Sequence, residues 1–533
     1  MNKKIIFNIY TVIFVNLVCL SLTCCEQNKS IQKPNELTLS EGFKNPTGFY
    51  NPKPTFSWQL PISEEVKSQF AYQIVVASSK HLLPNNPDLW DSNKQKTSQS
   101  TFVKYEGAHL QSRQKVYWQV RYWNQDKKAS EWSNANSFEL GLLNNSDWKA
   151  KWTGLDTAKD SIKGVRKFLM HRPQYLRKGF ELPKDVEKAR LYITSKGVFD
   201  VHLNGNDVSN DVLTPGWTPY NKRIETLTYD VTDLLTSGKN AIAVELASGW
   251  HSGRISRGKA VYENFASPKV LCQLEIILKD GSKKTIISDE TWKGTTNGPI
   301  RLASLYDGEM YDANLEIPNW NTATFEDSSW KNTEIEAIAD SVKLEPKRHT
   351  TVKQMVVLED AEIVSATKKA VVFNLKQNMV GVPKVTVPMK KGDTLTIRFS
   401  EMLLSDNTFY TKNYRSAKST DYYIAAKDGV IEYIPKFTFH GFQYIQLSGF
   451  DASAKPNASW VKGLVQHSEF DVNGTFRSSH DKLNQLQSNI TWGLRDNLLD
   501  IPTDCPQRDE RLGWTGDAQV ISPTAMYNFK MHA

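Results

Sequence analysis

The sequence predicts a multidomain protein made mainly of β-sandwich modules, with helices only near the end of the chain. Its 533 residues are too many for a single core, since a domain takes about 150 residues. Short runs of alternating apolar and polar residues, separated by turn residues, continue to about residue 465. After about residue 475 the apolar residues recur every three or four positions, which is the period of a helix.

The composition is that of a globular protein with many aromatic side chains. The 66 basic and 58 acidic residues give a net charge of +8 without any basic run, so no nucleic-acid partner is expected. Fifteen Trp and twenty Tyr suit either stacking on sugar faces or ordinary packing within β-sandwiches. Of five cysteines, only Cys272 and Cys505 lie beyond the N-terminal segment. We therefore expect neither a disulfide framework nor a multi-cysteine metal site.

Residues 1–25 have the order of an export signal. Lys3 and Lys4 precede an apolar stretch that ends at Cys24 and Cys25. The stretch resembles a bacterial lipoprotein signal, which implies lipidation at Cys25 and a membrane anchor in the cell envelope, at the outer membrane or in the periplasm. The alternative is a single transmembrane anchor, but the segment is short for one and no stop-transfer charges follow it.

Residues 36–147 predict an immunoglobulin-like or fibronectin-like β-sandwich. Ala71–Ala77 and Val116–Trp123 have the alternation of strands, Trp58 is a candidate core residue, and a last strand ends at Leu140. The absence of cysteine in this segment fits the fibronectin kind better.

Residues 148–347 predict a jelly roll of the carbohydrate-binding sort. Strands are expected at Ala189–Thr194, Val198–Leu203 and Ala241–Leu246. Asn204-Gly205 favours a type I′ hairpin turn.

The sequence suggests two hypotheses about what this module binds. Trp217, Tyr220 and Trp250 suit a sugar platform or buried packing equally well. The second hypothesis is a Ca²⁺ ion with Asn204 and Asp207 as candidate ligands, but an ordinary Asn-Gly turn is the favoured interpretation of these residues.

Residues 350–468 predict a further β-sandwich. Thr394–Ser400 alternates cleanly, and Lys436–Ile445 reads as a strand pair or a bent strand. Between them lies a polar loop, Glu401–Thr420, which contains Asn413, Tyr414 and Arg415.

The helical segment begins after about residue 475. Leu483, Leu486, Ile490, Leu494 and Leu498 share one helix face. Ser478 or Ser479 is expected to cap this helix. A loop over 499–514 and a second helix over Ala518–Phe529 are expected to follow.

The loop holds the most informative motif, which runs from Asp504 to Asp517 with the sequence DCPQRDERLGWTGD. Glycoside hydrolysis needs one carboxylic acid to protonate the leaving oxygen and a second carboxylate on the opposite ring face. Crowded carboxylates can raise one carboxyl pKa toward neutrality. Arg508 and Arg511 can orient the other carboxylates or bind hydroxyls, and Trp514 can pack on a sugar. From composition alone, a structural salt-bridge loop is the favoured interpretation, and spacing by itself does not decide between the two.

The motif resembles the signature of the α-L-rhamnosidases of glycoside hydrolase family 78. The resemblance extends upstream through Asn484–Gln487 and downstream through Ala518–Val520, and it includes His440–Tyr444. It implies an inverting hydrolase of terminal α-L-rhamnosides. The motif glutamate, the family's general acid, is Glu510 here. Asp504, Arg508, Trp514 and Asp517 fall on sugar-binding or supporting positions, whereas Asp509 serves the loop's geometry.

The resemblance also implies that residues 475–533 begin an (α/α)₆ catalytic barrel. The family's general base comes from a later part of that barrel, and no residue here matches it. We therefore expect this chain to be inactive by itself and its full-length parent to be the enzyme. No cofactor is expected to take part in catalysis, and no metal is expected at the acid.

The expected partners are rhamnose-containing glycans or glycosides. The alternative function is a cell-surface lipoprotein that binds glycans without cleaving them.

Overall fold

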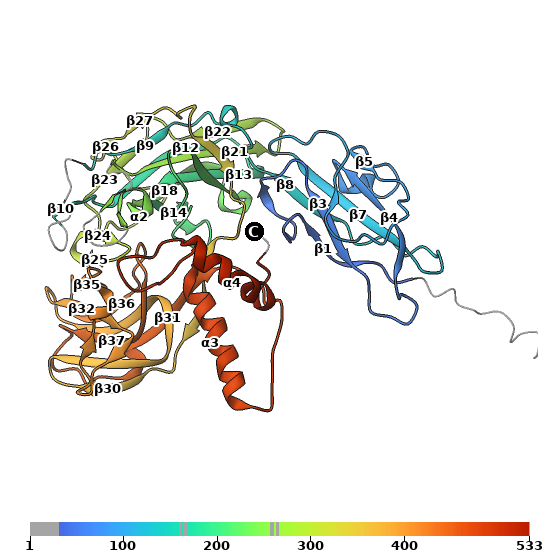
Figure 1. Cartoon of the computed structure of the whole chain (residues 1–533). Helices are drawn as coiled ribbons and strands as arrows, with labels where there is room; N and C mark the ends of the chain where they lie inside the picture. The colour runs from blue at the N-terminus through green and yellow to red at the C-terminus, as the bar shows by residue number, and fades with distance from the viewer. Residues whose placement is uncertain (1–30, 159–161, 164–168, 256–260, 263–265, 532–533) are drawn as a thin grey trace, which may run out of the picture. The chain divides into compact units, whose positions relative to one another are not determined.

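The computed structural model describes residues 31–158, 162–163, 169–255, 261–262 and 266–531 (Figure 1). The predicted signal peptide and Cys25 lie outside these residues. Residues 31–45, 53–109 and 115–137 form one compact unit, and residues 46–52, 110–114 and 138 onward form a second. Within the described ranges, every helix is too short or too polar to cross a membrane.

Unit 1 is built from two antiparallel sets of strands. Strands β1, β3 and β6 form one sheet, and β7, β4 and β5 lie side by side in another. These strands are β1 (Asn35–Leu39), β3 (Thr55–Gln59), β4 (Gln69–Ala77), β5 (Trp90–Asp91), β6 (Val103–Lys104) and β7 (Lys115–Asn124). Trp58 is 1% exposed, and its indole N–H donates to Gln69 Oε1 at 3.0 Å. The predicted strands β4 and β7 and the predicted core Trp58 are therefore confirmed.

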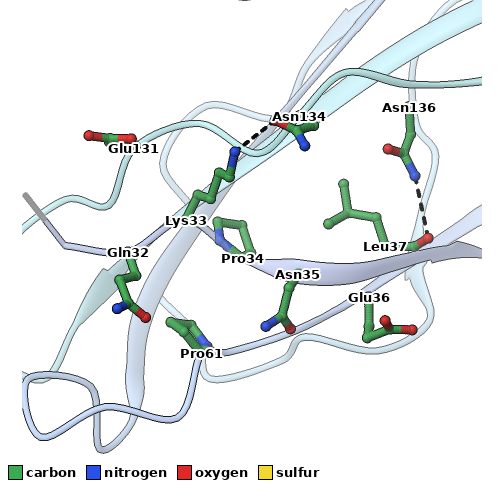
Figure 2. A pocket seen from close by; sticks show the side chains of 10 residues that line it. All are labelled: Gln32, Lys33, Pro34, Asn35, Glu36, Leu37, Pro61, Glu131, Asn134 and Asn136. Carbon is green, nitrogen blue, oxygen red and sulfur yellow. Dashed lines mark hydrogen bonds between the residues drawn. The ribbon is translucent and has the colours of Figure 1, made fainter.

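A polar hollow of about 550 Å³ lies on unit 1 (Figure 2). Lys33 Nζ donates to Asn134 Oδ1 at 2.8 Å beside it. None of its ten lining residues carries an aromatic ring, so the hollow lacks the flat apolar surface on which a sugar stacks.

Unit 2 begins with a sandwich of two sheets. The first sheet has the order β15-β14-β18-β12-β23-β26, and the second has the order β27-β9-β21-β13-β17-β28 with β22 beside β21. Strands of the first sheet are β12 (Gln174–Leu182), β14 (Val198–Leu203), β15 (Asn206–Asp207), β18 (Gly238–Ala247), β23 (Lys293–Thr295) and β26 (Lys331–Asn332). Strands of the second are β9 (Trp152–Gly154), β13 (Val186–Lys196), β17 (Arg223–Asp230), β21 (Lys269–Leu278), β22 (Lys283–Ile287), β27 (Glu334–Glu336) and β28 (Lys343–Pro346).

The inward-facing residues of these two sheets form one apolar core, which includes Leu176, Ile193, Val201, Val244 and Leu274. The strands predicted around residues 189–194, 198–203 and 241–246 are β13, β14 and β18. Asn204 and Gly205 have φ angles of +54° and +86° between the paired strands β14 and β15. Both angles are positive, as a type I′ turn requires.

An eleven-stranded sheet follows, along the path β16-β29-β38-β31-β37-β32-β35-β25-β24 with β30 and β36 beside β31. Its strands are β16 (Asp211–Val212), β24 (Ile300–Ser304), β25 (Gly308–Asp312), β29 (Val352–Leu358), β30 (Glu362–Ala366), β31 (Ala370–Met389), β32 (Thr394–Ser400), β35 (Thr420–Ile424), β36 (Gly429–Tyr433), β37 (His440–Ser448) and β38 (Val461–Ser468). Strands β16, β24 and β25 come from the range predicted for the jelly roll, so the two modules share a sheet.

The stretch predicted as a strand pair or bent strand over Lys436–Ile445 differs from the prediction. Strand β37 begins only at His440. The backbone N–H groups of Lys436 and Phe437 donate to the buried Glu309 carboxylate and are therefore lost to strand pairing.

The remaining elements are short. They are β2 (Thr47–Phe49), β8 (Asn136–Leu140), β10 (Ile162–Lys163), β11 (Leu169–Met170), β19 (Arg254–Ile255), β20 (Val261–Tyr262), β33 (Met402–Leu403), β34 (Phe409–Tyr410), β39 (Leu498–Leu499), β40 (Ile501–Pro502), α2 (Gly249–Ser252) and the 3₁₀ helices η1 (Lys80–Leu82), η2 (Asn145–Asp147), η4 (Thr232–Leu234), η5 (Ala313–Leu315), η6 (Lys412–Tyr414) and η7 (Ala458–Trp460).

Two helices close the described chain, α3 (Asp481–Asn497) and α4 (Thr515–Asn528). Helix α3 packs against β31 and β38 (Figure 1). The predicted serine cap is wrong, because His480 occupies the N-cap position without a side-chain cap. The Asn484 side chain instead bonds the backbone N–H and C=O of Ser478. Leu494 and Leu498 are buried against Ala525 and Phe529 of α4 and its end.

Candidate active site

The predicted catalytic loop lies between α3 and α4, as expected, and Asp504 closes its base. The Asp504 N–H donates to Leu512 O at 3.1 Å, and the Leu512 N–H donates to Asp504 Oδ1 at 3.0 Å. These two bonds join residues eight positions apart. Asp504 therefore holds the loop's shape in addition to any contact with a ligand.

Glu510 is held between two guanidinium groups. Arg415 Nη1 donates to Glu510 Oε2 at 2.7 Å, and Arg508 Nε donates to the same oxygen at 3.0 Å. The Tyr306 hydroxyl donates to the Glu510 backbone carbonyl at 2.6 Å. The glutamate is 5% exposed, so both its side chain and its backbone are fixed.

The electrostatics of Glu510 differ from the expectation. Burial opposes its charge, but the hydrogen bonds from Arg415 and Arg508 outweigh burial and lower the pKa of the carboxyl. Crowding by like charges was expected to raise this pKa. The expectation is wrong for this state because the nearest charges are cationic.

The two arginines of the motif have different environments. Arg508 donates to Glu510 and, from Nη2, to Asp504 Oδ2 at 3.3 Å. Arg511 is 2% exposed, and its guanidinium donates to Phe439 O at 3.0 Å and lies over the Tyr306 and Phe439 rings. Burial lowers the pKa of Arg511 to about 10. Arg511 therefore anchors the loop to the β modules. This differs from the expectation that Arg511 orients the carboxylates or binds hydroxyls.

Asp509 connects the loop to a neighbouring segment of the β modules. The Ser416 hydroxyl donates to the Asp509 carboxylate, and Arg254 donates to the Ser416 hydroxyl at 2.8 Å. Arg254 also pairs with Asp307 at 2.9 Å, and both side chains are 1% exposed. This chain of contacts agrees with a role for Asp509 in loop geometry.

A hollow of about 790 Å³ lies between α3, α4 and the loop. Asp504, Trp514 and Asp517 line it, and Trp514 is 47% exposed. Three of the four predicted sugar-binding residues therefore share one hollow. The fourth, Arg508, is not among the lining residues but donates to one of them, Asp504.

The loop over residues 214–220 of the jelly roll, which contains Trp217, contacts the start of the predicted catalytic loop. Asp500, in the turn between β39 and β40, accepts from the Trp217 N–H at 2.6 Å and from Lys347 Nζ at 2.7 Å. Lys347 also pairs with Glu225 at 3.0 Å, and both side chains are almost fully buried. A buried cation between two carboxylates thus fixes one end of the catalytic loop.

The proposed sugar platform is largely packed. Tyr220 and Trp250 are 6% and 4% exposed, which favours their packing role. Trp217 is partly buried and stacks on Trp250 at 6.4 Å between ring centroids.

The side chains of the candidate Ca²⁺ ligands, Asn204 and Asp207, contact other groups of the protein. The Asn204 side-chain oxygen accepts from the Ala241 N–H at 2.8 Å, and its amide donates to Leu234 O. Asp207 Oδ1 faces His202 Nδ1 at 2.8 Å.

Two groups among the described residues bring three potential metal ligands together: Asp504, Cys505 and Glu510, and separately Asp200, His202 and Glu245. In the first group Glu510 is already paired with two arginines, and burial raises the pKa of the Cys505 thiol to about 11. Both features disfavour a metal beside the candidate acid, since a thiol must be deprotonated to bind one.

Sequence reasoning missed the residues that reach the acid loop from elsewhere in the chain. Arg415 is 95 positions from Glu510, and Tyr306 is 204 positions away. The only available signal was the polarity of the Glu401–Thr420 loop, which does not say what the loop contacts.

Four family models match the chain. They are described as an α-L-rhamnosidase N-terminal domain (residues 184–356), a Rha78A-like N-terminal immunoglobulin domain (34–144), a bacterial α-L-rhamnosidase concanavalin-like domain (365–467) and a bacterial α-L-rhamnosidase six-hairpin glycosidase domain (471–533). An α-L-rhamnosidase of Formosa agariphila is 64% identical over 525 residues, which are 98% of this chain and 57% of that protein. This chain belongs to the bacterial α-L-rhamnosidase family.

Solved rhamnosidase structures have the same fold. The α-L-rhamnosidase of Dictyoglumus thermophilum is similar with a TM-score of 0.87 at 35% identity, over 94% of this chain and 56% of that one. The Streptomyces avermitilis α-L-rhamnosidase, solved in complex with L-rhamnose, is similar with a TM-score of 0.86 at 29% identity, over 93% and 63%. The chain therefore spans a little over half the length of these rhamnosidases.

Proposed function

We propose that this chain carries the acid-bearing and sugar-binding part of an inverting α-L-rhamnosidase that removes terminal α-L-rhamnose from glycans or glycosides. The observation that supports this most is the position of Glu510. The loop and the β modules hold it rigidly, next to Arg508 and Asp504, and Asp504 lines a hollow with Trp514 and Asp517. Glu510 is the general acid in this proposal.

A general acid must be protonated before it can donate, yet Arg415 and Arg508 favour the carboxylate. The proposal resolves this through the substrate. Arg508 is partly exposed and can turn toward sugar hydroxyls, which removes one of the two cations from Glu510. The pKa of Glu510 then rises when substrate is present, because one opposite charge has been withdrawn.

The other residues divide the binding task. Trp514 offers an exposed indole to the apolar face of the sugar, and Asp504 and Asp517 accept hydrogen bonds from hydroxyls. Inversion further requires a second carboxylate about 6.5–9.5 Å from the acid, with room for a water between them. The proposal assigns that base to a later part of an (α/α)₆ barrel whose first hairpin is α3 and α4, and it assigns no activity to the chain without a base.

Export and lipidation at Cys25, a Ca²⁺ ion in the jelly roll and the absence of a catalytic cofactor complete the proposal as inferences from sequence. The alternative, a lipoprotein that binds glycans without cleaving them, is supported by the many aromatic residues but does not require the acid loop. We favour the enzyme, because a protein that only binds glycans has no need of a loop that carries a buried glutamate between two arginines.

Saturation-transfer NMR with L-rhamnose tests the sugar-binding part of the proposal. Transfer to L-rhamnose is expected with the 533-residue chain, and the Trp514→Ala and Asp517→Asn variants should weaken it. D-Galactose serves as the matched sugar, and Trp217→Ala as the control variant within the jelly roll. Transfer that depends on Trp217 but not on Trp514 would favour the binding-protein alternative.

A further inference from the structure

A second polar cluster lies in the jelly roll, on one face of the six-stranded sheet. Asp200 on β14 is directly opposite Glu245 on β18 in the strand register. His202 is two residues further along β14, so its side chain leaves the same face of the sheet. One potential ligand atom from each of the three side chains lies within 4.8 Å of the other two.

The histidine is held with one ring nitrogen directed at this cluster. His202 Nδ1 lies 2.8 Å from the Asp207 carboxylate. An ionised carboxylate only accepts, so Nδ1 is the donor of this bond and Nε2 is the ring nitrogen that is left to bind a metal. His202 Nε2 makes no hydrogen bond to the described residues. It faces Asp200 Oδ2 at 3.7 Å, with the imidazole side chain 5% exposed.

The carboxylates of the cluster already attract one cation. Lys436 Nζ lies 2.9 Å from Asp200 Oδ2 and 2.7 Å from Glu245 Oε2. Asp200 and Glu245 together carry two negative charges, which one ammonium group only half neutralises. Lys436 is 41% exposed, so its long side chain can reach water without disturbing the sheet.

We propose that Asp200, His202 and Glu245 form a binding site for a divalent transition-metal ion of the Zn²⁺ class, which exchanges with the Lys436 ammonium. A divalent ion neutralises both carboxylates fully when Lys436 leaves. The imidazole lone pair favours Zn²⁺ and its neighbours over Ca²⁺, which prefers oxygen ligands only. Asp207 is the outer carboxylate that fixes the tautomer of a metal-bound histidine.

The site is open to solvent on one side. Glu245 and Lys436 line a hollow of about 430 Å³ together with Trp320, and the Trp320 ring packs edge-on against His202. Ligand bonds of about 2.0–2.2 Å require the three side chains to close slightly around the ion. Three protein ligands leave at least one coordination position of the ion for water or a hydroxyl-bearing molecule.

The test is titration of the 533-residue chain with Zn²⁺ by calorimetry and with Co²⁺ by visible absorption. The expected result is one equivalent bound, with a cobalt spectrum that lacks a thiolate charge-transfer band.

Lys436→Met removes the competing cation and should tighten binding at least tenfold. His202→Asn and, as a second variant in case the first misfolds, Asp200→Asn should each weaken binding at least tenfold. Circular dichroism checks the fold of each variant.

Cys505→Ser is the matched control, because Cys505 belongs to the other group of three potential ligands. The inference predicts unchanged metal binding in this variant. It is overturned if neither the chain nor Lys436→Met binds Zn²⁺, or if binding survives in folded His202→Asn and Asp200→Asn variants. A thiolate band that disappears in Cys505→Ser would place the ion at the other group and would equally overturn it.

Discussion

At the scale of single residues, the central feature is one carboxylate oxygen that accepts from two guanidinium groups. Glu510 Oε2 accepts one hydrogen bond from Arg508, which lies in the same loop, and one from Arg415, which lies in the loop between β34 and β35. Arg415 has a φ of +55°, which is unfavourable for a residue with a Cβ. Tertiary contacts therefore hold this arginine in place, and its charge acts on the candidate acid.

Replacing Arg415 should raise the pKa of Glu510. Arg415→Gln removes one of the two cations that stabilise the carboxylate, so protonation becomes easier. The pKa is obtained from the difference between potentiometric titrations of each protein and of its Glu510→Gln counterpart. Lys412→Gln, which removes a positive charge from the same loop, is the control and should leave the value unchanged. An unchanged or lower pKa in Arg415→Gln would contradict the assigned contact.

At the scale of elements, the turn between β39 and β40 connects the catalytic loop to the jelly roll. Gly216 has a φ of +101°, and a Cβ placed there would lie 2.1 Å from Asp500 Oδ1. The Asp500 carboxylate cannot easily move aside, because Lys347 and the Trp217 N–H both hold it. Glycine is therefore required at this contact for backbone conformation and for space.

Gly216→Ala should lower the free energy of unfolding by about 3 kcal/mol, as the sum of left-handed backbone strain and steric overlap. Gly281→Ala is a matched control, since Gly281 has a φ of +80° with nothing within 4 Å of the added Cβ. It should cost only about 1 kcal/mol. Urea unfolding measures the free energy of unfolding of both variants. An equal decrease in the two would show that the contact with Asp500 is unimportant.

Much of the fold at this scale was predictable, because alternation specifies strands wherever one face is buried. Strand β32 runs over Thr394–Ser400 as predicted. The start of strand β37 was misjudged, because a distant carboxylate, Glu309, accepts from the N–H groups of Lys436 and Phe437, which precede the strand. The same limit applies to the site. The motif itself indicated Glu510 and its loop, but Arg415 and Asp500 act through contacts between distant segments that spacing does not reveal.

Helix α3 contains a buried acid with a pH-dependent effect on stability. Burial, with a contribution from the charge of Glu401, raises the pKa of Asp496 to about 8. The pKa of an aspartate in an unfolded chain is about 3.9. The unfolded chain therefore loses this proton first, and stability falls as the pH rises from about 4 to about 8.

Asp496→Asn removes this ionisation. Thermal unfolding should show the variant equal to the parent chain at pH 4 and more stable than it at pH 8. A variant that is less stable at pH 8 would mean that Asp496 is ionised and paired in the folded protein.

At the scale of the whole molecule, six of the nineteen exposed large apolar side chains of the described residues lie on the two C-terminal helices. Leu486 on α3 is 54% exposed, and Val520 and Tyr527 on α4 are each 80% exposed. The other thirteen lie outside these two helices, and single exposed apolar residues are ordinary on protein surfaces.

An apolar dye should report this surface. The double variant Leu486→Glu, Val520→Glu should reduce the fluorescence of bound anilinonaphthalene sulfonate by about half or more, because it removes two of the exposed apolar side chains of α3 and α4. Val430→Glu is the control, since Val430 is 66% exposed on β36 and belongs to neither helix. An equal reduction by both changes would indicate that the dye binds elsewhere.

The central claim, that Glu510 donates a proton to the leaving group of an α-L-rhamnoside, is tested most directly by leaving-group dependence. Release of phenol and of 2,4-dinitrophenol from their α-L-rhamnosides is followed for the chain and for Glu510→Gln. Azide is added as an external nucleophile, so that the result does not depend on a general base. We predict that Glu510→Gln slows phenol release by about 10²–10⁴-fold and barely affects dinitrophenol, which leaves without protonation. Equal effects of the substitution on the two substrates would contradict the assignment of Glu510 as the acid.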